Sequence, residues 1–202
     1  AKKAPAKKAA KKVAGGARVT IRHYCQGIGD CHLLTFNRGG GNPPYRMLID
    51  CGIHTSVKGG GEIVRKIAED IKTVLNGAPI DVLVVTHEHW DHVSGFTSKA
   101  GKVFEGITVN EVWMPWTENP EDQLARDLDT YKGNALAALA AVGSRLGSLP
   151  SAPSRLKGIG KGVEALMQFN FGADGDNVRR ARNKAKALAK GKDPVYLQPK
   201  SK

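Results

Sequence analysis

The sequence contains no histidine after position 92, although the chain continues to residue 202. All six histidines therefore lie in the first half of the chain. Any imidazole that binds a metal or moves a proton must come from this half. The second half cannot complete a histidine-based site on its own.

Long apolar runs and abundant cysteines are also absent. No stretch approaches the roughly 18 apolar residues that a membrane-spanning helix needs, so we expect no membrane span. The three cysteines, Cys25, Cys31 and Cys51, are odd in number and follow no apolar secretory segment. They predict reduced thiols in a cytoplasmic protein rather than a disulfide framework. No serine–histidine or cysteine–histidine arrangement suggests nucleophilic catalysis.

Acidic residues are scarce at the two ends of the chain, and the formal net charge is +12. Residues 1–12 hold six lysines and no acid, and residues 179–202 hold nine basic residues against Asp193 alone. The body between them, 13–178, carries 16 basic and 18 acidic residues. The body is therefore nearly neutral, and the basic character belongs to the ends.

The N-terminal tail, residues 1–16, is rich in lysine and alanine and has no apolar face to bury. Its self-repulsion predicts disorder. Such tails bind nucleic acid or another polyanion through counterion release, without reading sequence. A merely solubilising extension is the alternative, since no aromatic residue is interleaved to stack on bases.

Apolar periodicity predicts the following elements along the body. Alternation indicates strands, and apolar residues at helical spacing from Glu62 to Leu75 indicate an amphipathic helix. The predicted strands are 17–25, 31–37, 45–50, 81–85 and 109–114. A helix is expected from Asn119, with Pro120 at its first position, to about Leu146. Later strand candidates are 167–169 and 195–197.

Residues 147–160 read as a linker, because they are rich in glycine, proline and serine. Residues 161–202 read as a basic C-terminal segment with a helix over about 176–190. This helix is a second candidate for polyanion binding, and a solvated basic face is the plainer interpretation.

The most informative run is Thr86 to His92, which holds three histidines and an aspartate directly after an apolar strand. In extended backbone His87 and His89 point the same way. A helical turn after them would bring Asp91 and His92 to a second point nearby. These two pairs suit two adjacent cations, and imidazole and carboxylate suit zinc. A helical His-Glu-x-x-His zinc site is excluded, because position 91 is aspartate and a strand precedes the run.

The pattern His87-x-His89-x-Asp91-His92, followed by Val93-Ser94-Gly95, resembles the signature of the metallo-β-lactamase fold superfamily. Two upstream segments are also similar to that family: 47–52 (Met-Leu-Ile-Asp-Cys-Gly) and 27–34 (Gly-Ile-Gly-Asp-Cys-His-Leu-Leu). The Gly-Asp-Cys form is similar to the subgroup related to the soluble domain of bacterial DNA-uptake channel proteins. The three motifs agree in order and spacing over residues 17 to about 116.

The resemblance implies an α/β (α+β) fold, an αββα sandwich, and a metallo-hydrolase with two zinc ions. In that family a bridging hydroxide attacks an ester, amide or phosphodiester. His87, His89, Asp91 and His92 would bind metal, and Asp91 would also hold the attacking water as a catalytic residue. Asp50 would hydrogen-bond and orient the ligands. Trp116 is a candidate substrate contact.

The family pattern also includes later ligands, namely a third histidine, a bridging aspartate and a final histidine, together with a second β-half. Since His92 is the last histidine, residues 17–146 are expected to form only the N-terminal half of the fold. The second metal site is then incomplete, and a complementary C-terminal half chain is an expected partner.

Two functional hypotheses follow. In the first, the chain belongs to a dizinc hydrolase, with a phosphodiester favoured by the DNA-uptake resemblance and the basic ends. In the second, it is a truncated, non-catalytic metal-binding remnant whose basic tails hold nucleic acid or an anionic partner.

Overall fold

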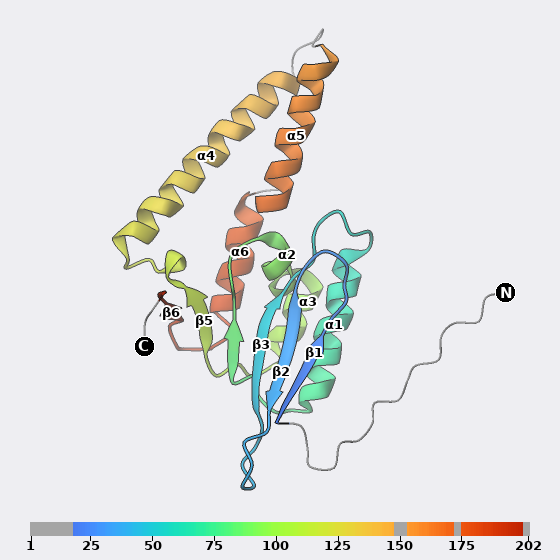
Figure 1. The fold of residues 1–202 in the computed structure, drawn as a ribbon, viewed down its shortest axis with the longest axis vertical. Coiled ribbons are helices and arrows are strands. Elements are labelled where there is room, and N and C mark those ends of the chain that lie inside the picture. Colours follow the sequence, from blue (N-terminus) through green and yellow to red (C-terminus); the bar gives the residue numbers. More distant parts are fainter. Residues whose placement is uncertain (1–17, 148–152, 172–174, 200–202) are drawn as a thin grey trace, which may run out of the picture.

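The protein was analysed as a computed structural model, which describes residues 18–147, 153–171 and 175–199. The predicted N-terminal tail, 1–16, lies entirely outside these residues. The described strands form one six-stranded sheet in the order β1-β2-β3-β4-β5-β6 (Figure 1). Their bounds are β1 Val19–His23, β2 Cys31–Phe36, β3 Tyr45–Cys51, β4 Val82–Val84, β5 Val112–Pro115 and β6 Val195–Leu197.

The sheet is antiparallel on one side and parallel on the other. β1 pairs with β2 and β2 with β3 in antiparallel register, whereas β3, β4, β5 and β6 run parallel. Parallel neighbours need crossover connections, and helices supply them. Helix α1 joins β3 to β4, helices α2 and α3 join β4 to β5, and helices α4 to α6 join β5 to β6. The mixed α/β class expected from the sequence is confirmed.

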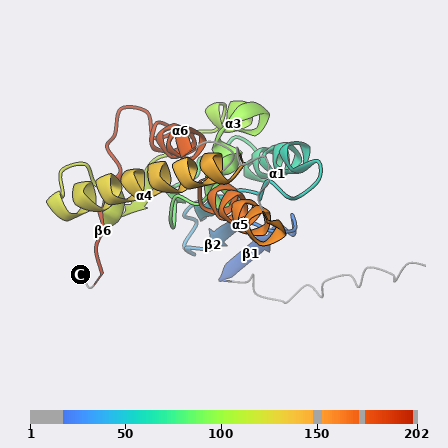
Figure 2. The same cartoon turned by 90° about the horizontal axis from the view of Figure 1, so that it is seen from above.

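Helices cover one face of the sheet. Helix α1 (Gly60–Leu75), helix α3 (Ser98–Glu105) and helix α6 (Gly175–Lys186) lie on the same side of the strands (Figure 2). Helices α4 (Gln123–Gly147) and α5 (Ser154–Phe171) form a hairpin that projects beyond the end of the sheet (Figure 1). Three short segments complete the fold: α2 (Trp90–Val93), η1 (Ser94–Phe96) and η2 (Trp116–Glu118).

The hydrophobic core lies between this face and the helices. Leu33, Leu48, Leu83 and Val112 are neighbours across four strands, and each is at most 2% exposed. Apolar residues of α1 at helical spacing, such as Ile71, join the same core. Burying a side chain of this size stabilises the fold by about 1.5–3 kcal/mol.

No helix among the described residues lies on the opposite face, which we call the open face (Figure 2). Ile21, Leu34 and Met47 are register neighbours on it, and Ile21 is 65% exposed. The strand positions on this face are mostly apolar, and they include Ile21, Leu34, Met47, Ile49, Val84, Trp113 and Val195. Of the predicted αββα sandwich, the described residues thus contain one α layer and one β layer.

Three local predictions were wrong. Residues 154–160, expected in a linker, begin helix α5, and 167–169, a strand candidate, belong to the same helix. The helix expected from Asn119 begins later, at Gln123, because Asp122 is the residue whose side chain accepts the backbone N–H of Ala125. Helix α5 thus crosses the predicted boundary at residue 160, and the division of the chain into domains stays a prediction. No described helix is both long and apolar enough to cross a bilayer.

Candidate metal centre

Three sequence motifs meet at the carboxyl ends of β3 and β4. The backbone N–H of Asp30 donates to the carbonyl of Asp91 at 3.2 Å, and that of Gly52 donates to the carbonyl of Asp30 at 3.1 Å. A Cβ on Gly52 would lie 2.3 Å from the backbone of Asp91. A Cβ on Gly29 would lie 2.5 Å from the carbonyl oxygen of Gly52. Only glycine allows these backbones to approach so closely.

The histidine run, residues 86–92, follows strand β4 and leads into helix α2. His89 has extended backbone (φ −65°, ψ 147°) and immediately precedes the first residue of the helix, Trp90. The resulting turn brings three imidazole rings together, whereas the sequence predicted two pairs, His87 with His89 and Asp91 with His92. The ring centroid of His87 lies 4.5 Å from that of His89 and 3.9 Å from that of His92.

Asp50 ties the histidine run to the end of strand β3. Its side chain is 2% exposed, and its backbone adopts a positive φ of 52°. Oδ1 accepts the backbone N–H of Thr86 at 2.8 Å, and Oδ2 accepts the Thr86 hydroxyl at 2.6 Å. Oδ2 also lies 2.9 Å from Nδ1 of His92. This contact fixes the ring of His92 and leaves its Nε2 to face elsewhere.

One carboxylate oxygen of Asp91 is buried and unsatisfied, as expected of a metal ligand. The residue is 8% exposed, and its Oδ1 is buried without a hydrogen-bond partner. Oδ2 lies 3.8 Å from Nε2 of His92. A buried carboxylate oxygen without a partner is costly, and a bound metal ion removes that cost. The nitrogen and oxygen donors gathered here are those that zinc accepts.

The donor side chains are neighbours, but they do not point to one common position. Within the described part of the chain, no three histidine, cysteine, aspartate or glutamate side chains are placed so that they could hold one metal ion. The residues fit zinc in donor type and in the unsatisfied oxygen of Asp91, but not in their arrangement.

The local environment shifts the pKa values of the three histidines in different directions. Burial lowers the pKa of His87 and of His89, and for His87 the neighbouring histidines lower it further. Burial also lowers the pKa of His92, but its hydrogen bond to Asp50 and the charges of Asp50, Asp91 and Asp30 outweigh this and raise it. His87 and His89 therefore favour the neutral state that binds metal, whereas His92 competes for a proton.

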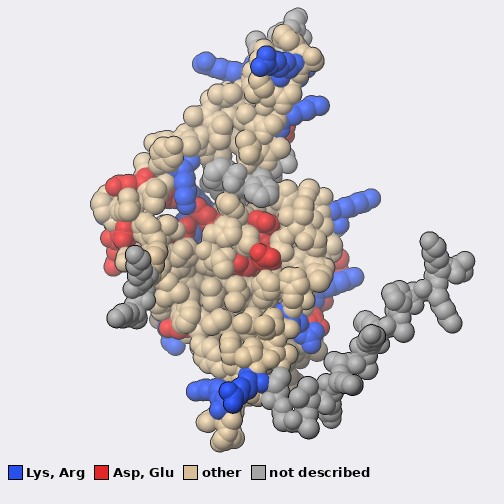
Figure 3. All heavy atoms as spheres, in the orientation of Figure 1, with Lys and Arg blue, Asp and Glu red and all other residues tan. Residues whose placement is uncertain are grey.

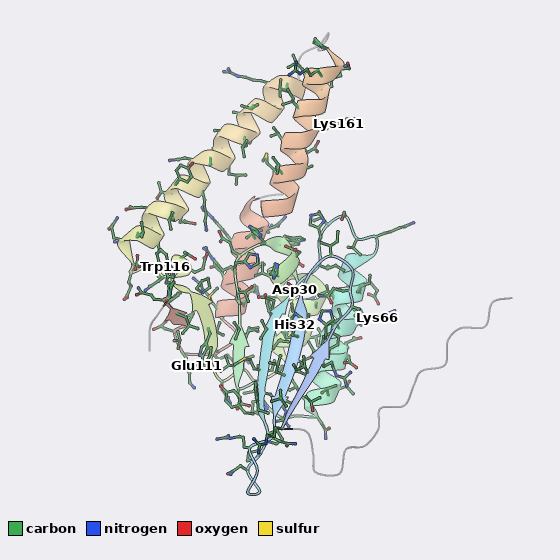
Figure 4. The ribbon with its side chains drawn as sticks, in the orientation of Figure 1. Asp30, His32, Lys66, Glu111, Trp116 and Lys161 are labelled. Atoms are coloured by element: carbon green, nitrogen blue, oxygen red, sulfur yellow. The ribbon has the colours of Figure 1, made fainter. Side chains whose placement is uncertain are left out.

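Two acidic residues near the site were not assigned from the sequence. Asp30 Oδ2 lies 3.6 Å from Nδ1 of His92, and Asp30 is labelled beside His32 in Figure 4. The signal was the Gly-Asp-Cys segment, which carried the family resemblance without a role for its aspartate. Glu88 faces Lys132 and Arg182 instead of the rings, and nothing in the local sequence indicated those partners.

A cavity adjoins the histidine run, whereas Trp116 lies elsewhere. A cavity of about 480 Å³ opens beside the histidine run and is lined by residues including Trp90, His54 and Ser94. Trp116, the predicted substrate contact, is partly buried in η2 at the end of β5, away from Asp30 in Figure 4. Its role stays a prediction. Figure 3 shows acidic side chains gathered above the middle of the face in view, with basic side chains scattered at its margins.

Comparison with protein families identifies the class. The family model of the metallo-beta-lactamase superfamily matches residues 38–168, and the chain belongs to this superfamily. Its members are mostly metal-dependent hydrolases and typically bind zinc. The match covers the histidine run and helix α4, and it reaches into helix α5. No curated protein matches the chain.

Proposed function

We propose that this protein is a metal-dependent hydrolase whose metal centre is built on His87, His89, Asp91 and His92. The observation that carries the proposal is the buried, unpartnered Oδ1 of Asp91 beside three clustered imidazole rings. Family membership supports the same reaction class.

The chain's own residues have distinct tasks in this proposal. His87 and His89 supply neutral imidazoles, and His92 supplies Nε2 while Asp50 holds its Nδ1. Asp91 would bind metal with one oxygen and would accept a hydrogen bond from a water molecule with the other. When bound, two zinc ions would polarise the scissile group and lower the pKa of water towards neutrality.

Metal binding by the full chain tests this proposal. We expect zinc to bind the purified chain and His89→Ala to weaken binding at least about tenfold, since it removes one ligand. His23→Ala, which changes an exposed histidine on β1, should leave the affinity unchanged. Equal zinc affinity in His89→Ala and in the unaltered chain would refute the site.

For the substrate, we propose a phosphodiester. The resemblance of Gly29-Asp30-Cys31 to the DNA-uptake subgroup and the basic chain ends support it. The test is zinc-dependent hydrolysis of bis(p-nitrophenyl) phosphate compared with a carboxylic ester and a β-lactam. Faster turnover of either of the other two substrates would exclude this choice.

We further propose that a complementary polypeptide supplies the later ligands. Two observations support it: the described donors do not converge on one point, and an apolar open face lies on the same sheet. We expect the isolated chain to bind fewer zinc ions than the chain with its partner, which should bind about two. About two ions bound by the isolated chain would contradict it.

A non-catalytic metal-binding protein with basic tails is the second candidate, because no described trio of ligands is preformed. The described part of the C-terminal segment offers limited support for polyanion binding. Arg182 is occupied by Glu88 and Glu118, Arg179 lies 3.6 Å from Asp129, and Lys184 lies 3.4 Å from Glu105. Zinc binding without hydrolysis of any tested ester, with salt-dependent DNA binding, would favour this candidate. A cytoplasmic location is proposed for either function.

A further inference from the structure

Glu88 stands between two proposed ligands in the sequence, but its side chain faces the helices. Its side chain is 14% exposed. Oε1 accepts a hydrogen bond from Nζ of Lys132 in helix α4 at 2.9 Å. Oε2 accepts one from Nη1 of Arg182 in helix α6 at 3.0 Å.

A second buried carboxylate closes this arrangement into a ring of four charges. Arg182 Nη1 also donates to Oε2 of Glu118 in η2, a residue whose side chain is 3% exposed. Lys132 Nζ lies 3.9 Å from Oε1 of the same glutamate. Nearby, Lys186 Nζ donates to the backbone carbonyl of Glu118 at 3.2 Å. We call Glu88, Lys132, Arg182 and Glu118 the charge ring.

The charge ring is held away from solvent, except at Lys132. The side chain of Arg182 is 15% exposed, and the charges of Glu118 and Glu88 raise its pKa although burial lowers it. Burial raises the pKa of Glu88, but the hydrogen bond and charge of Lys132 and the charge of Arg182 outweigh it and lower the pKa. Partly buried charges are weakly screened by salt, so these contacts hold their partners firmly.

Because Glu88 lies within the histidine run, the charge ring affects the backbone of that run. His89 has extended backbone, and side chains alternate in such a segment, so neighbours of Glu88 point away from it. The rings of His87 and His89 accordingly lie together, 4.5 Å apart, while Glu88 reaches the helices. Anchoring Glu88 therefore restricts the backbone that aims both rings.

We infer that Arg182 and Lys132 are positioning residues for the metal centre, acting through Glu88 on the orientation of His87 and His89. This inference rests on the proposed metal binding. It assigns a role to a residue that lies 94 positions from Glu88 in the sequence. It also makes α6 part of the metal centre rather than a free basic tail.

Zinc affinity of the full chain is the first test. Residues that support metal ligands typically change metal affinity by 10–100-fold when they are replaced. We expect Arg182→Met to weaken zinc binding by about tenfold or more, measured by competition with a chromophoric chelator. The matched control is Arg180→Met on the exposed side of the same helix, which should leave the affinity unchanged.

A conservative change separates positioning from general stability. Nη1 of Arg182 alone meets both carboxylates, and the shorter side chain of Arg182→Lys keeps the charge but does not bring its nitrogen as far. The zinc affinity of Arg182→Lys should therefore fall between that of the unaltered chain and that of Arg182→Met. If Arg182→Met does not fold, Lys132→Met at the more exposed corner serves instead. Variants that unfold more easily but bind zinc like the unaltered chain would overturn the inference.

The histidine rings of the metal-free chain give a readout that does not depend on zinc. In nitrogen-15 NMR spectra, Arg182→Met should broaden or shift the ring signals of His87 and His89, and leave those of His23 unchanged. Unchanged His87 and His89 signals would refute the positioning role. Failure of the unaltered chain to bind zinc would instead refute the proposed function, while the ring signals still decide this inference.

Discussion

In the described part of the chain, helices pack on only one of the two faces of the sheet, although the side chains of both faces are mostly apolar. On the covered face, Leu33 and Leu48 are buried under α1 and α3, whereas on the open face Ile21 is 65% exposed. Both faces are nevertheless apolar along β2, β3 and β4. Strands that are buried on both sides read as continuous apolar runs, whereas strands with one wet face alternate. The apolar composition of the open face is therefore typical of strands that are buried on both sides.

The first prediction compares adjacent residues on opposite faces of β2. Leu33→Ala should destabilise the chain by about 2–5 kcal/mol, because it leaves a cavity in a closed core. Leu34→Ala should cost about 1 kcal/mol, since its side chain is only partly buried on the open face. Chemical denaturation of both variants measures the difference. Equal losses would show that the open face is as well packed as the other.

The second prediction concerns His92, at the end of the sheet. Its folded pKa is raised above the ordinary value of about 6.5, so the folded state binds this proton more tightly. The stabilisation is complete below about pH 6.5 and is lost as pH rises through the folded pKa. Asp50→Asn should lower the pKa of His92, because it removes the charge at 2.9 Å. NMR titration of the metal-free chain measures both values.

In the same titration His87 and His89 should protonate below the ordinary value, since burial disfavours their charged form. Zinc binding should then weaken as pH falls, with His92 the first of the three to take up a proton. A titration in which the order is reversed would contradict the roles assigned to Asp50 and burial.

The smallest effect on stability is expected from Ile21→Lys on the open face. An exposed substitution of this kind changes the free energy of unfolding by no more than about 0.5 kcal/mol. It should nevertheless reduce the fluorescence of a bound hydrophobic dye, because it interrupts the apolar surface. The control is Val74→Lys, an exposed apolar residue on helix α1. If the unaltered chain gives no dye fluorescence, the open face is covered in solution.

Local patterns were sufficient to predict most elements up to β5. Apolar spacing located α1, and the strand before His87 was found because its apolar residues end in a polar loop. The late helices were harder to delimit. Glycine and proline near Ser154 suggested a linker, but helix α5 forms there, since packing against α4 outweighs weak propensity.

The candidate site could be predicted only in part, for a similar reason. His87, His89, Asp91 and His92 are adjacent in sequence, so a single turn gathers them. Asp50 and Asp30 belong to motifs that the family resemblance had marked. The partners of Glu88 could not be found, because contacts across such separations leave no local periodicity or spacing to read.

The sequence by itself determined the class of this protein, since the histidine run, its preceding strand and the two glycine-containing motifs are local patterns. It also determined that every imidazole ligand of this chain must come from the first 92 residues. Only the tertiary structure decided which sheet face is covered and which basic residues are occupied. Arg182 meets Glu88 because crossover connections bring α6 back against the sheet, and the packing of distant elements fixes that geometry.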